Sequence, residues 1–324
     1  GDEFALVVDD VDPVALEALC AQMARVIARP IGTTETELGL SVSIGVAIAP
    51  TDASTGSELM RCADIALDQA QADGCGTHRF FSQRMNERIV TRQKLEQELR
   101  LAIRDKALEV HYQPQVDAQT LRLCGAEALV RWRHPKRGLL APNEFIPTAE
   151  ETGLIVPLGE FVLETACIAA LDWPGIRVAV NLSPTQFRDQ NLVGSIERIL
   201  DRTGIEPGRV ELELTESVLV EDRAVALATL GALRKLGVHL ALDDFGSGYS
   251  SLNYLRMFPF SRLKIDRAFI ADLKPAGEAR AIVRAIIDLG RSLGMEVVAE
   301  GVEAIEQLLI LRADHCGTIQ GYYT

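Results

Sequence analysis

The chain has 324 residues, of which 48% are hydrophobic, and its formal net charge at pH 7 is −13. A chain of this length has room for two domains, each with its own core. The acidic balance argues against broad binding to nucleic acid or anionic membranes, because those surfaces require a basic patch. The sequence contains neither an apolar run of membrane-spanning length nor a signal-peptide pattern.

The first residue and the cysteines indicate that the chain is part of a longer protein and lies in a reducing compartment. It begins with Gly1 instead of an initiator methionine, so we expect it to be part of a longer protein whose upstream region could anchor it to a membrane. Six cysteines occur without a C-x-x-C pair, which is typical of free thiols in a reducing cytoplasm: Cys20, Cys62, Cys75, Cys124, Cys167 and Cys316.

Residues 1–81 alternate strand-like and helix-like segments. We predict a strand over 4–8, a helix from 13 to about 28, a strand over 40–49 and a helix through 63–67. This alternation is typical of a small α/β unit.

Residues 82–104 form a polar stretch with apolar residues spaced for one face of a long helix. We predict a linker helix that packs one face on its own domain, and a seam with a partner helix is the alternative. The apolar positions are Met85, Ile89, Leu95, Leu99 and Ile103.

From residue 105 onward, eight strand-like runs are separated by helical segments. This rhythm predicts an α/β fold of the TIM type, a (β/α)8 barrel, with an open doubly wound sheet as the competitor. The G-x-G-x-x-G pattern of dinucleotide-binding sheets is absent. The runs are 109–116, 125–131, 177–182, 209–215, 239–244, 262–266, 296–301 and 316–321.

Reading the runs with a period of two separates an apolar outer set from a polar inner set. In a parallel barrel the outer face packs against helices, so the polar set points inward and gathers near the C-terminal strand ends. Five carboxylates converge there, with Asp244 turning back from beyond the regular strand. The inner carboxylates are Glu127, Glu213, Asp243, Asp244 and Glu300.

Five carboxylates at a partly buried mouth require compensating charge, and Lys264 with Arg131 supplies too little. Mg²⁺ or Mn²⁺ would supply it, since both prefer oxygen ligands, and Asn181 adds a neutral one. A pair of metals about 3.5 to 4 Å apart would suit attack on a phosphodiester. The glycine-rich loop after Asp244 would close over the substrate.

Seven ordered motifs make the region 105–324 resemble the EAL-domain cyclic di-GMP phosphodiesterases. They are EAL at 127–129, NLSP at 181–184, ELTE at 213–216, DDFGSGYSS at 243–251, KIDR at 264–267, AEGVE at 299–303 and QGY at 320–322. The resemblance implies a modified barrel whose first strand is antiparallel to the others. It also implies a cyclic di-GMP-specific phosphodiesterase, a hydrolase that gives linear pGpG.

The resemblance assigns roles to individual residues. Catalytic roles fall to Lys264, which would orient or deprotonate the attacking water, and to Glu127 and Glu300. Arg131, Leu129 and Gln320 would contact substrate, with Gln320 also holding water at the metals, and Glu216 would anchor the loop after Asp244. The first metal would bind Glu127, Asn181, Glu213 and Asp243, and the second would bind Asp243, Asp244 and Glu300.

The N-terminal region resembles the C-terminal half of a GGDEF domain, the diguanylate cyclase module. The matching segments are GDEF at 1–4, SIGVA at 43–47 and ADIAL at 63–67. Gln71 and Cys75 replace the lysine and arginine that contact GTP phosphates in the family. We therefore hypothesise an inactive cyclase module that binds GTP at most as a regulator, in a chain divided into 1–81, 82–104 and 105–324.

Alternative interpretations remain for both function and single residues. The chain would otherwise be a non-catalytic cyclic di-GMP receptor, although receptors of this type usually lose metal ligands. The resemblance also implies a homodimer with contacts near the Asp244 loop. For a second group of polar and aromatic residues we expect structural roles only: Glu211, Asp266, His134, His239, Trp132 and Trp173.

Overall fold

The computed structural model describes residues 3–9, 12–32, 37–74, 76–219, 223–246 and 252–323. It divides into two compact units, Gly1–Leu95 and Glu96–Thr324. Several predicted features lie outside the described residues, namely Gly1, Asp2, Cys75 and the loop positions 247–251.

The first unit is a small α/β assembly, as predicted. Asp12 caps the N-terminus of helix α1, because its carboxylate accepts the N–H groups of Val14 and Ala15. Helix α2 packs against β3 at Gly45, where a Cβ would collide with the α2 backbone. The elements are α1 Pro13–Ile27, β1 Ile31–Gly32, β2 Glu37–Leu38, β3 Ile44–Val46, α2 Gly56–Ala72 and β4 His78–Phe80.

Two strand predictions in this unit need correction. The strand over 40–49 is reduced to Ile44–Val46, which pairs in parallel with β4. The prediction of a strand over 4–8 is wrong, because residues 3–9 have no regular structure and Phe4 and Val7 remain exposed. An apolar run forms a strand only when a neighbouring strand satisfies its backbone, and no described strand pairs with this one.

Helix α3 spans Gln83–Arg104 and confirms the predicted long helix. Its C-terminal half buries Leu95, Leu99 and Ala102. Glu98 on the same half lies 3.1 Å from His134 Nε2 of the second unit, to which Glu98 also belongs. This part of the helix therefore packs on its own unit, as expected.

The second unit is a closed barrel of the eight predicted strands. Their order is β5, β13, β12, β11, β10, β9, β8 and β6, and β6 pairs with β5 to close the ring. Strand β5 is antiparallel to both neighbours, as the resemblance implied, and the other ring pairings are parallel. Closure excludes the doubly wound alternative. The ring strands are β5 Leu108–Asp117, β6 Leu123–His134, β8 Arg177–Asn181, β9 Val210–Thr215, β10 His239–Phe245, β11 Arg262–Ile265, β12 Glu296–Glu300 and β13 Thr318–Gln320.

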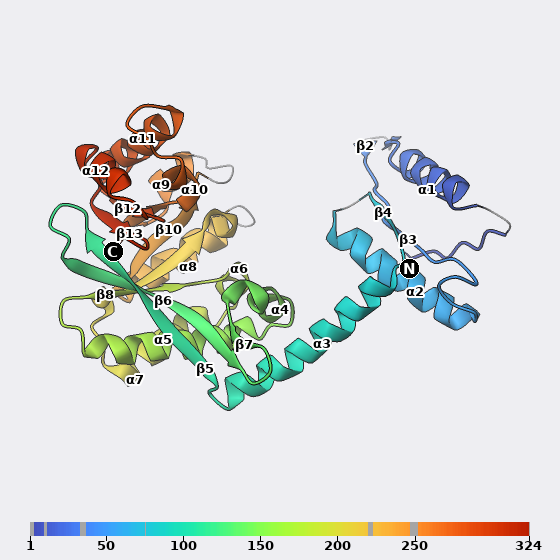
Figure 1. The fold of residues 1–324 in the computed structure, drawn as a ribbon, viewed down its shortest axis with the longest axis horizontal. Coiled ribbons are helices and arrows are strands. Elements are labelled where there is room, and N and C mark those ends of the chain that lie inside the picture. Colours follow the sequence, from blue (N-terminus) through green and yellow to red (C-terminus); the bar gives the residue numbers. More distant parts are fainter. Residues whose placement is uncertain are drawn as a thin grey trace. The chain divides into compact units, whose positions relative to one another are not determined.

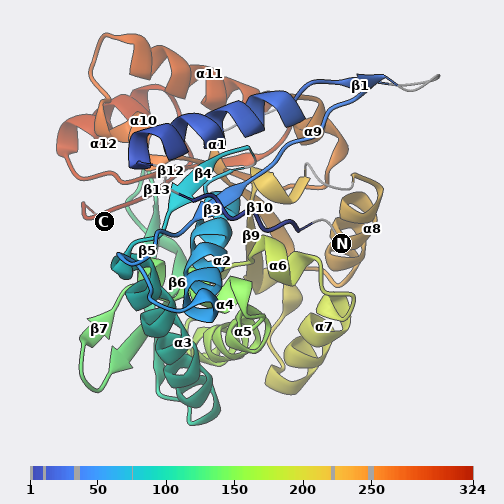
Figure 2. The same ribbon diagram turned by 90° about the vertical axis from the view of Figure 1, so that its right-hand side faces the viewer.

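Helices surround this ring, and β7 Gly138–Leu140 extends β6 as an added antiparallel strand (Figure 1, Figure 2). The helices are α4 Ile146–Glu151, α5 Ile155–Leu171, α6 Pro184–Phe187, α7 Leu192–Thr203, α8 Arg223–Lys235, α9 Leu252–Met257, α10 Arg267–Ala271, α11 Glu278–Ser292 and α12 Ile305–Ala313. Short 3₁₀ turns occupy Pro142–Glu144, Pro207–Arg209 and Glu216–Leu219.

The outward faces of the strands carry leucines that are almost fully buried under the helices, including Leu212, Leu214, Leu240 and Leu263. This packing forces the alternate side chains of each strand into the barrel interior. Among the described residues, no helix combines the length and the apolar character that crossing a bilayer requires.

The barrel wall predicts opposite effects for the same substitution at two helical glycines. Gly290 of α11 is buried, and a Cβ there would collide with Val297 Cγ2 of β12, so Gly290→Ala should lower the free energy of unfolding by about 1–3 kcal/mol. Gly194 of α7 is exposed with no atom near its Cβ position, so Gly194→Ala should raise it by up to about 1 kcal/mol. Urea unfolding of both variants measures the difference. Equal effects would contradict the packing of α11 on β12.

Candidate metal centre and active site

One ammonium group lies among four carboxylates at the barrel mouth. Lys264 Nζ is 2.6 Å from Glu213 and from Glu300, 3.3 Å from Asp243 and 3.6 Å from Glu127. Lys264 and Glu213 are each only 1% exposed. Five strands contribute these side chains at alternating positions, so the period-two reading placed them correctly.

Glu127 is held by two amide groups as well as by Lys264. Asn181 Nδ2 donates to Glu127 Oε1 at 2.7 Å, and Gln320 Nε2 donates to Glu127 Oε2 at 2.5 Å. Burial raises the pKa of Glu127, but Lys264 and the two amides outweigh it and the net pKa is lowered. Glu127 is therefore an ionised carboxylate with a fixed orientation, as a metal ligand would require.

Asp243 and Asp244 reach the same side of the sheet through a bulge in β10. The pairing of β10 with β11 shifts register between Leu242 and Phe245, and Asp244 has a left-handed φ of 53°. Strand β10 thus continues to Phe245 instead of ending before Asp244. The Asp244 N–H donates to Asp243 Oδ1 at 2.9 Å, which stabilises the bulge.

The pKa values report an excess of negative charge. Burial and the neighbouring Asp243, together with a hydrogen bond to Asp266, raise the pKa of Asp244 to about 6. Burial raises the pKa of Glu300 to about 7 even though Lys264 opposes the rise. Burial also raises the pKa of Glu213 well above its usual value. The single ammonium of Lys264 therefore does not balance the negative charge of the surrounding carboxylates.

The oxygen atoms fit a divalent cation. Carboxylate oxygens of Asp243, Asp244 and Glu300 lie within 4.8 Å of one another. Glu213 Oε1 is buried and, among the described residues, lacks a hydrogen-bond partner. Coordination of Mg²⁺ or Mn²⁺ would explain an unsatisfied buried carboxylate oxygen among several other carboxylates.

The remaining predicted site residues surround this cluster. Gly246 N–H donates to Glu216 Oε1 at 3.2 Å, so Glu216 contacts the start of the loop that continues into residues outside the described ranges. Leu129 and Arg131 follow Glu127 on the inner face of β6 and are both partly buried. The Arg131 guanidinium donates to the Val130 carbonyl oxygen and is turned toward its own strand.

A second polar layer lies below the first, toward the N-terminal strand ends. Arg262 donates to Glu211 at 2.9 Å and to Glu296 at 2.6 Å, and Arg177 lies 3.2 Å from Glu211 and 3.1 Å from Glu296. Glu211 is fully buried and paired, as expected of an interior structural residue.

Three residues near the cluster were not predicted to belong to it. Gln113 and Gln115 of β5 contact Gln320, with Gln113 Oε1 accepting at 3.1 Å and Gln115 Nε2 donating at 2.9 Å. Asp266 contacts Asp244 in addition to capping α10. Applying the period-two reading to β5 would have identified both glutamines.

The other residues expected to be structural are so. His134 Nδ1 accepts the N–H groups of Lys136 and Arg137 and thereby holds a turn. Trp132 packs edge-to-face on Phe145, and Trp173 on Tyr112. His239 lies at the start of β10 beside Ser261, far along the strand from Asp243.

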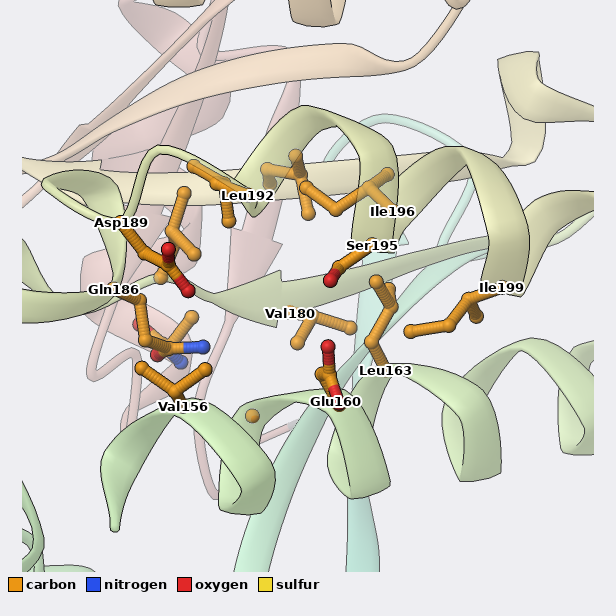
Figure 3. Close-up of a pocket in the computed structure, with 14 residues that line it drawn as sticks. Val156, Glu160, Leu163, Val180, Gln186, Asp189, Leu192, Ser195, Ile196 and Ile199 are labelled. Atoms are coloured by element: carbon orange, nitrogen blue, oxygen red, sulfur yellow. The ribbon is translucent and has the colours of Figure 1, made fainter. Parts of the chain in front are cut away.

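A small cavity lies outside β8, between α5 and α7. Figure 3 shows Glu160 of α5 and Ser195 of α7 pointing into it, and Asn181 is also one of its lining residues. Its volume of about 30 Å³ is enough for a water molecule and far below that of a nucleotide site. This cavity is therefore too small to be the binding site of a substrate of nucleotide size.

Comparison with known families agrees with this geometry. The family model described as "EAL domain" matches residues 96–324, and the one described as "Diguanylate cyclase, GGDEF domain" matches residues 1–77. Among solved structures, "PaMucR Phosphodiesterase, c-di-GMP complex" has a TM-score of 0.68 and 45% identity, covering 71% of this chain and 95% of that one.

Two curated relatives match nearly the whole chain. An uncharacterized signaling protein of Caulobacter vibrioides is 45% identical over 99% of this chain and 40% of its own length. The bifunctional diguanylate cyclase/cyclic di-GMP phosphodiesterase MucR of Pseudomonas aeruginosa is 41% identical over 99% of this chain and 48% of its own length. The chain thus spans less than half of these relatives.

The raised carboxylate pKa values predict an unusual pH dependence in the absence of divalent cations. Asp244 at about 6 and Glu300 at about 7 bind protons more tightly in the folded state than in the unfolded state, where carboxylates titrate near pH 4. Stability in EDTA should therefore increase as the pH falls from about 8 to about 5. Glu127 titrates below this window and Lys264 above it.

Thermal melting in EDTA across this range checks the prediction. The Glu300→Gln variant removes one of the titrating groups, so its melting temperature should depend less on pH. An identical pH dependence in both proteins would contradict the crowded-carboxylate description of the mouth.

Proposed function

Because this chain belongs to the EAL domain family, we propose that it hydrolyses cyclic di-GMP to linear pGpG with two divalent metal ions, Mg²⁺ or Mn²⁺. The observation that carries the proposal is the contact of a single ammonium with four carboxylates at the barrel mouth. The printed names of relatives support the substrate, since MucR and NbdA of Pseudomonas aeruginosa are both named as cyclic di-GMP phosphodiesterases.

The metal ligands would be divided into two overlapping sets. Glu127, Asn181, Glu213 and Asp243 would hold the first ion, and Asp243, Asp244 and Glu300 the second. Asp243 serves both sets because it lies between the Lys264 contact and the Asp244 bulge. Bound divalent ions would polarise a phosphoryl oxygen and favour the ionisation of water.

Lys264 would orient or deprotonate the attacking water. Burial lowers the pKa of Lys264, but the four carboxylates raise it more strongly, so the net pKa is well above the usual value. In the absence of metal the ammonium donates hydrogen bonds to the carboxylates, and bound cations would reduce the carboxylate charge that raises its pKa. Its 2.6 Å contacts with Glu213 and Glu300 fix the ammonium next to both sets of ligands.

Substrate contacts would come from the rim of the mouth. Arg131 would bind a phosphate after turning away from the Val130 carbonyl, which is a weak alternative partner for a guanidinium. Leu129 would pack against the substrate, and Gln320 would hold water near the metals. Glu216 would fix the loop after Asp244 through Gly246.

A cyclic di-GMP receptor without catalysis is the second candidate. It shares the binding site, so binding alone does not distinguish the two functions. The complete oxygen ligand set favours the enzyme, because a receptor needs no cluster of unbalanced carboxylates. Chromatography of the products formed from cyclic di-GMP separates them: pGpG supports the enzyme, and binding without product supports the receptor.

The N-terminal module and the assembly form a further part of the proposal. The proposed domain division is 1–81, 82–104 and 105–324. The first domain would bind GTP as a regulator of the phosphodiesterase. The protein would act in a reducing cytoplasm. Stimulation of pGpG formation by GTP would support the regulatory role of the first domain. Synthesis of cyclic di-GMP by a full-length protein lacking Glu127 would contradict the hypothesis that its cyclase module is inactive.

We also propose that the protein forms a homodimer. Sedimentation that shows an active but strictly monomeric protein would exclude the homodimer.

Removal of a ligand tests the metal assignment directly. Glu127→Ala should lower the rate of pGpG formation more than about 100-fold, because losing a ligand costs more than losing its supporting partner. EDTA should abolish the reaction of the unaltered protein, and Mg²⁺ or Mn²⁺ should restore it. Glu197→Ala, on the exposed face of α7, is the matched control and should retain full activity. Unchanged turnover in Glu127→Ala would refute the assignment.

A further inference from the structure

A chain of buried side chains connects the two polar layers of the barrel. Arg262 Nη1 donates to Gln115 Oε1 at 3.1 Å, Gln115 Nε2 donates to Gln320 Oε1 at 2.9 Å, and Gln320 Nε2 donates to Glu127 Oε2 at 2.5 Å. All four side chains belong to residues less than 7% exposed. This series of hydrogen bonds starts at Arg262, among the lower ion pairs, and ends at Glu127, a predicted metal ligand.

The two ends of this chain fix its direction. An arginine guanidinium has donors only, and an ionised carboxylate has acceptors only. Gln115 must therefore turn its oxygen to Arg262 and its nitrogen to Gln320. Gln320 must in turn present its oxygen to Gln115 and its nitrogen to Glu127, and the reversed order would leave acceptors facing each other at Glu127 and donors facing each other at Arg262.

The surrounding backbone is shaped for Gln115. Its partners in the sheet are Gly125 on β6 and Gln320 on β13. A Cβ at Gly125 would lie 2.6 Å from Gln115 Oε1, so the glycine leaves the space in which the amide oxygen meets Arg262. Arg262 is itself fixed by Glu211 and Glu296.

We propose that Gln115 is a positioning residue for the metal centre, which transmits the fixed orientation of Arg262 through Gln320 to Glu127. This rests on the proposed function, because it takes Glu127 as a metal ligand. Gln115 itself would touch neither metal nor substrate. Its effect is to hold the Gln320 amide with its N–H groups toward Glu127 and Gln113.

Two substitutions of Gln115 separate orientation from packing. Gln115→Glu keeps the shape and the contact with Arg262 but offers no donor to Gln320, so Gln320 would rotate and set its oxygen against Glu127. Gln115→Met keeps the approximate volume and removes both hydrogen bonds. Mn²⁺ affinity should fall about tenfold or more in Gln115→Glu, as for other partners of metal ligands, and by a smaller factor in Gln115→Met.

Titration calorimetry with Mn²⁺ alone, on the whole chain, is the readout, and thermal melting is recorded in parallel. A packing role would lower the melting temperature most in Gln115→Met and would not weaken Mn²⁺ binding most in Gln115→Glu. Gln119→Met, on the exposed loop after β5, is the control and should bind Mn²⁺ like the unaltered protein. Arg262→Lys retains a donor-only cation and should retain more affinity than Arg262→Met.

The outcomes distinguish this proposal from the proposed function. If the unaltered protein binds Mn²⁺ and both folded Gln115 variants bind it within about twofold, the positioning role is wrong and the phosphodiesterase proposal stands. If the unaltered protein binds neither Mn²⁺ nor Mg²⁺, both proposals are overturned. The predicted order of affinities, unaltered above Gln115→Met above Gln115→Glu, supports the positioning role.

Discussion

Burying the Lys264 ammonium at the barrel mouth requires anionic partners, and its four carboxylate partners bring more negative charge than one ammonium balances. Moving a charged group from water into the protein costs roughly several kcal/mol unless close partners of opposite charge compensate it. Lys264 is compensated, whereas the carboxylates as a group are not. The raised pKa values of Glu213, Asp244 and Glu300 are the direct consequence. A fold selected for stability alone would replace some of these residues with apolar ones, so the excess charge is better explained by bound cations.

The lower layer of the barrel is built from the same kinds of residue with the opposite result. Arg177 and Arg262 face Glu211 and Glu296, two cations against two anions, and each guanidinium contacts both carboxylates. The charges of this layer are balanced, so it needs no additional ion. The two layers are only two residues apart along β9 and β11. The balanced layer is a structural network, whereas the unbalanced layer is a candidate site for chemistry.

Much of this arrangement could be predicted from the sequence because it follows from backbone periodicity. The eight strands and the inward positions of Glu127, Glu213, Lys264 and Glu300 depend only on alternation and on the apolar outer face. The strand at 4–8 could not be predicted correctly, since its existence depends on a neighbouring strand. The link through Gln115 was missed for a different reason, although alternation along β5 would have placed its side chain inside the barrel. Gln115 and Gln320 pair across β5 and β13, which are far apart in the sequence, and neutral amides carry no charge imbalance that would indicate such a contact.

The Asp244 bulge shows why alternation alone would give an incomplete site. In a regular strand Asp244 would point outward, opposite Asp243, and bury a carboxylate against the helices. The left-handed backbone at Asp244 avoids this and returns its side chain to the mouth, at a cost of about 1–3 kcal/mol for a non-glycine residue. Such a conformation persists only when neighbours hold it, and the bonds from Asp244 N–H to Asp243 and from Gly246 N–H to Glu216 do so on either side of the bulge. The position of the Asp244 carboxylate therefore depends on Glu216, which lies at the end of a different strand.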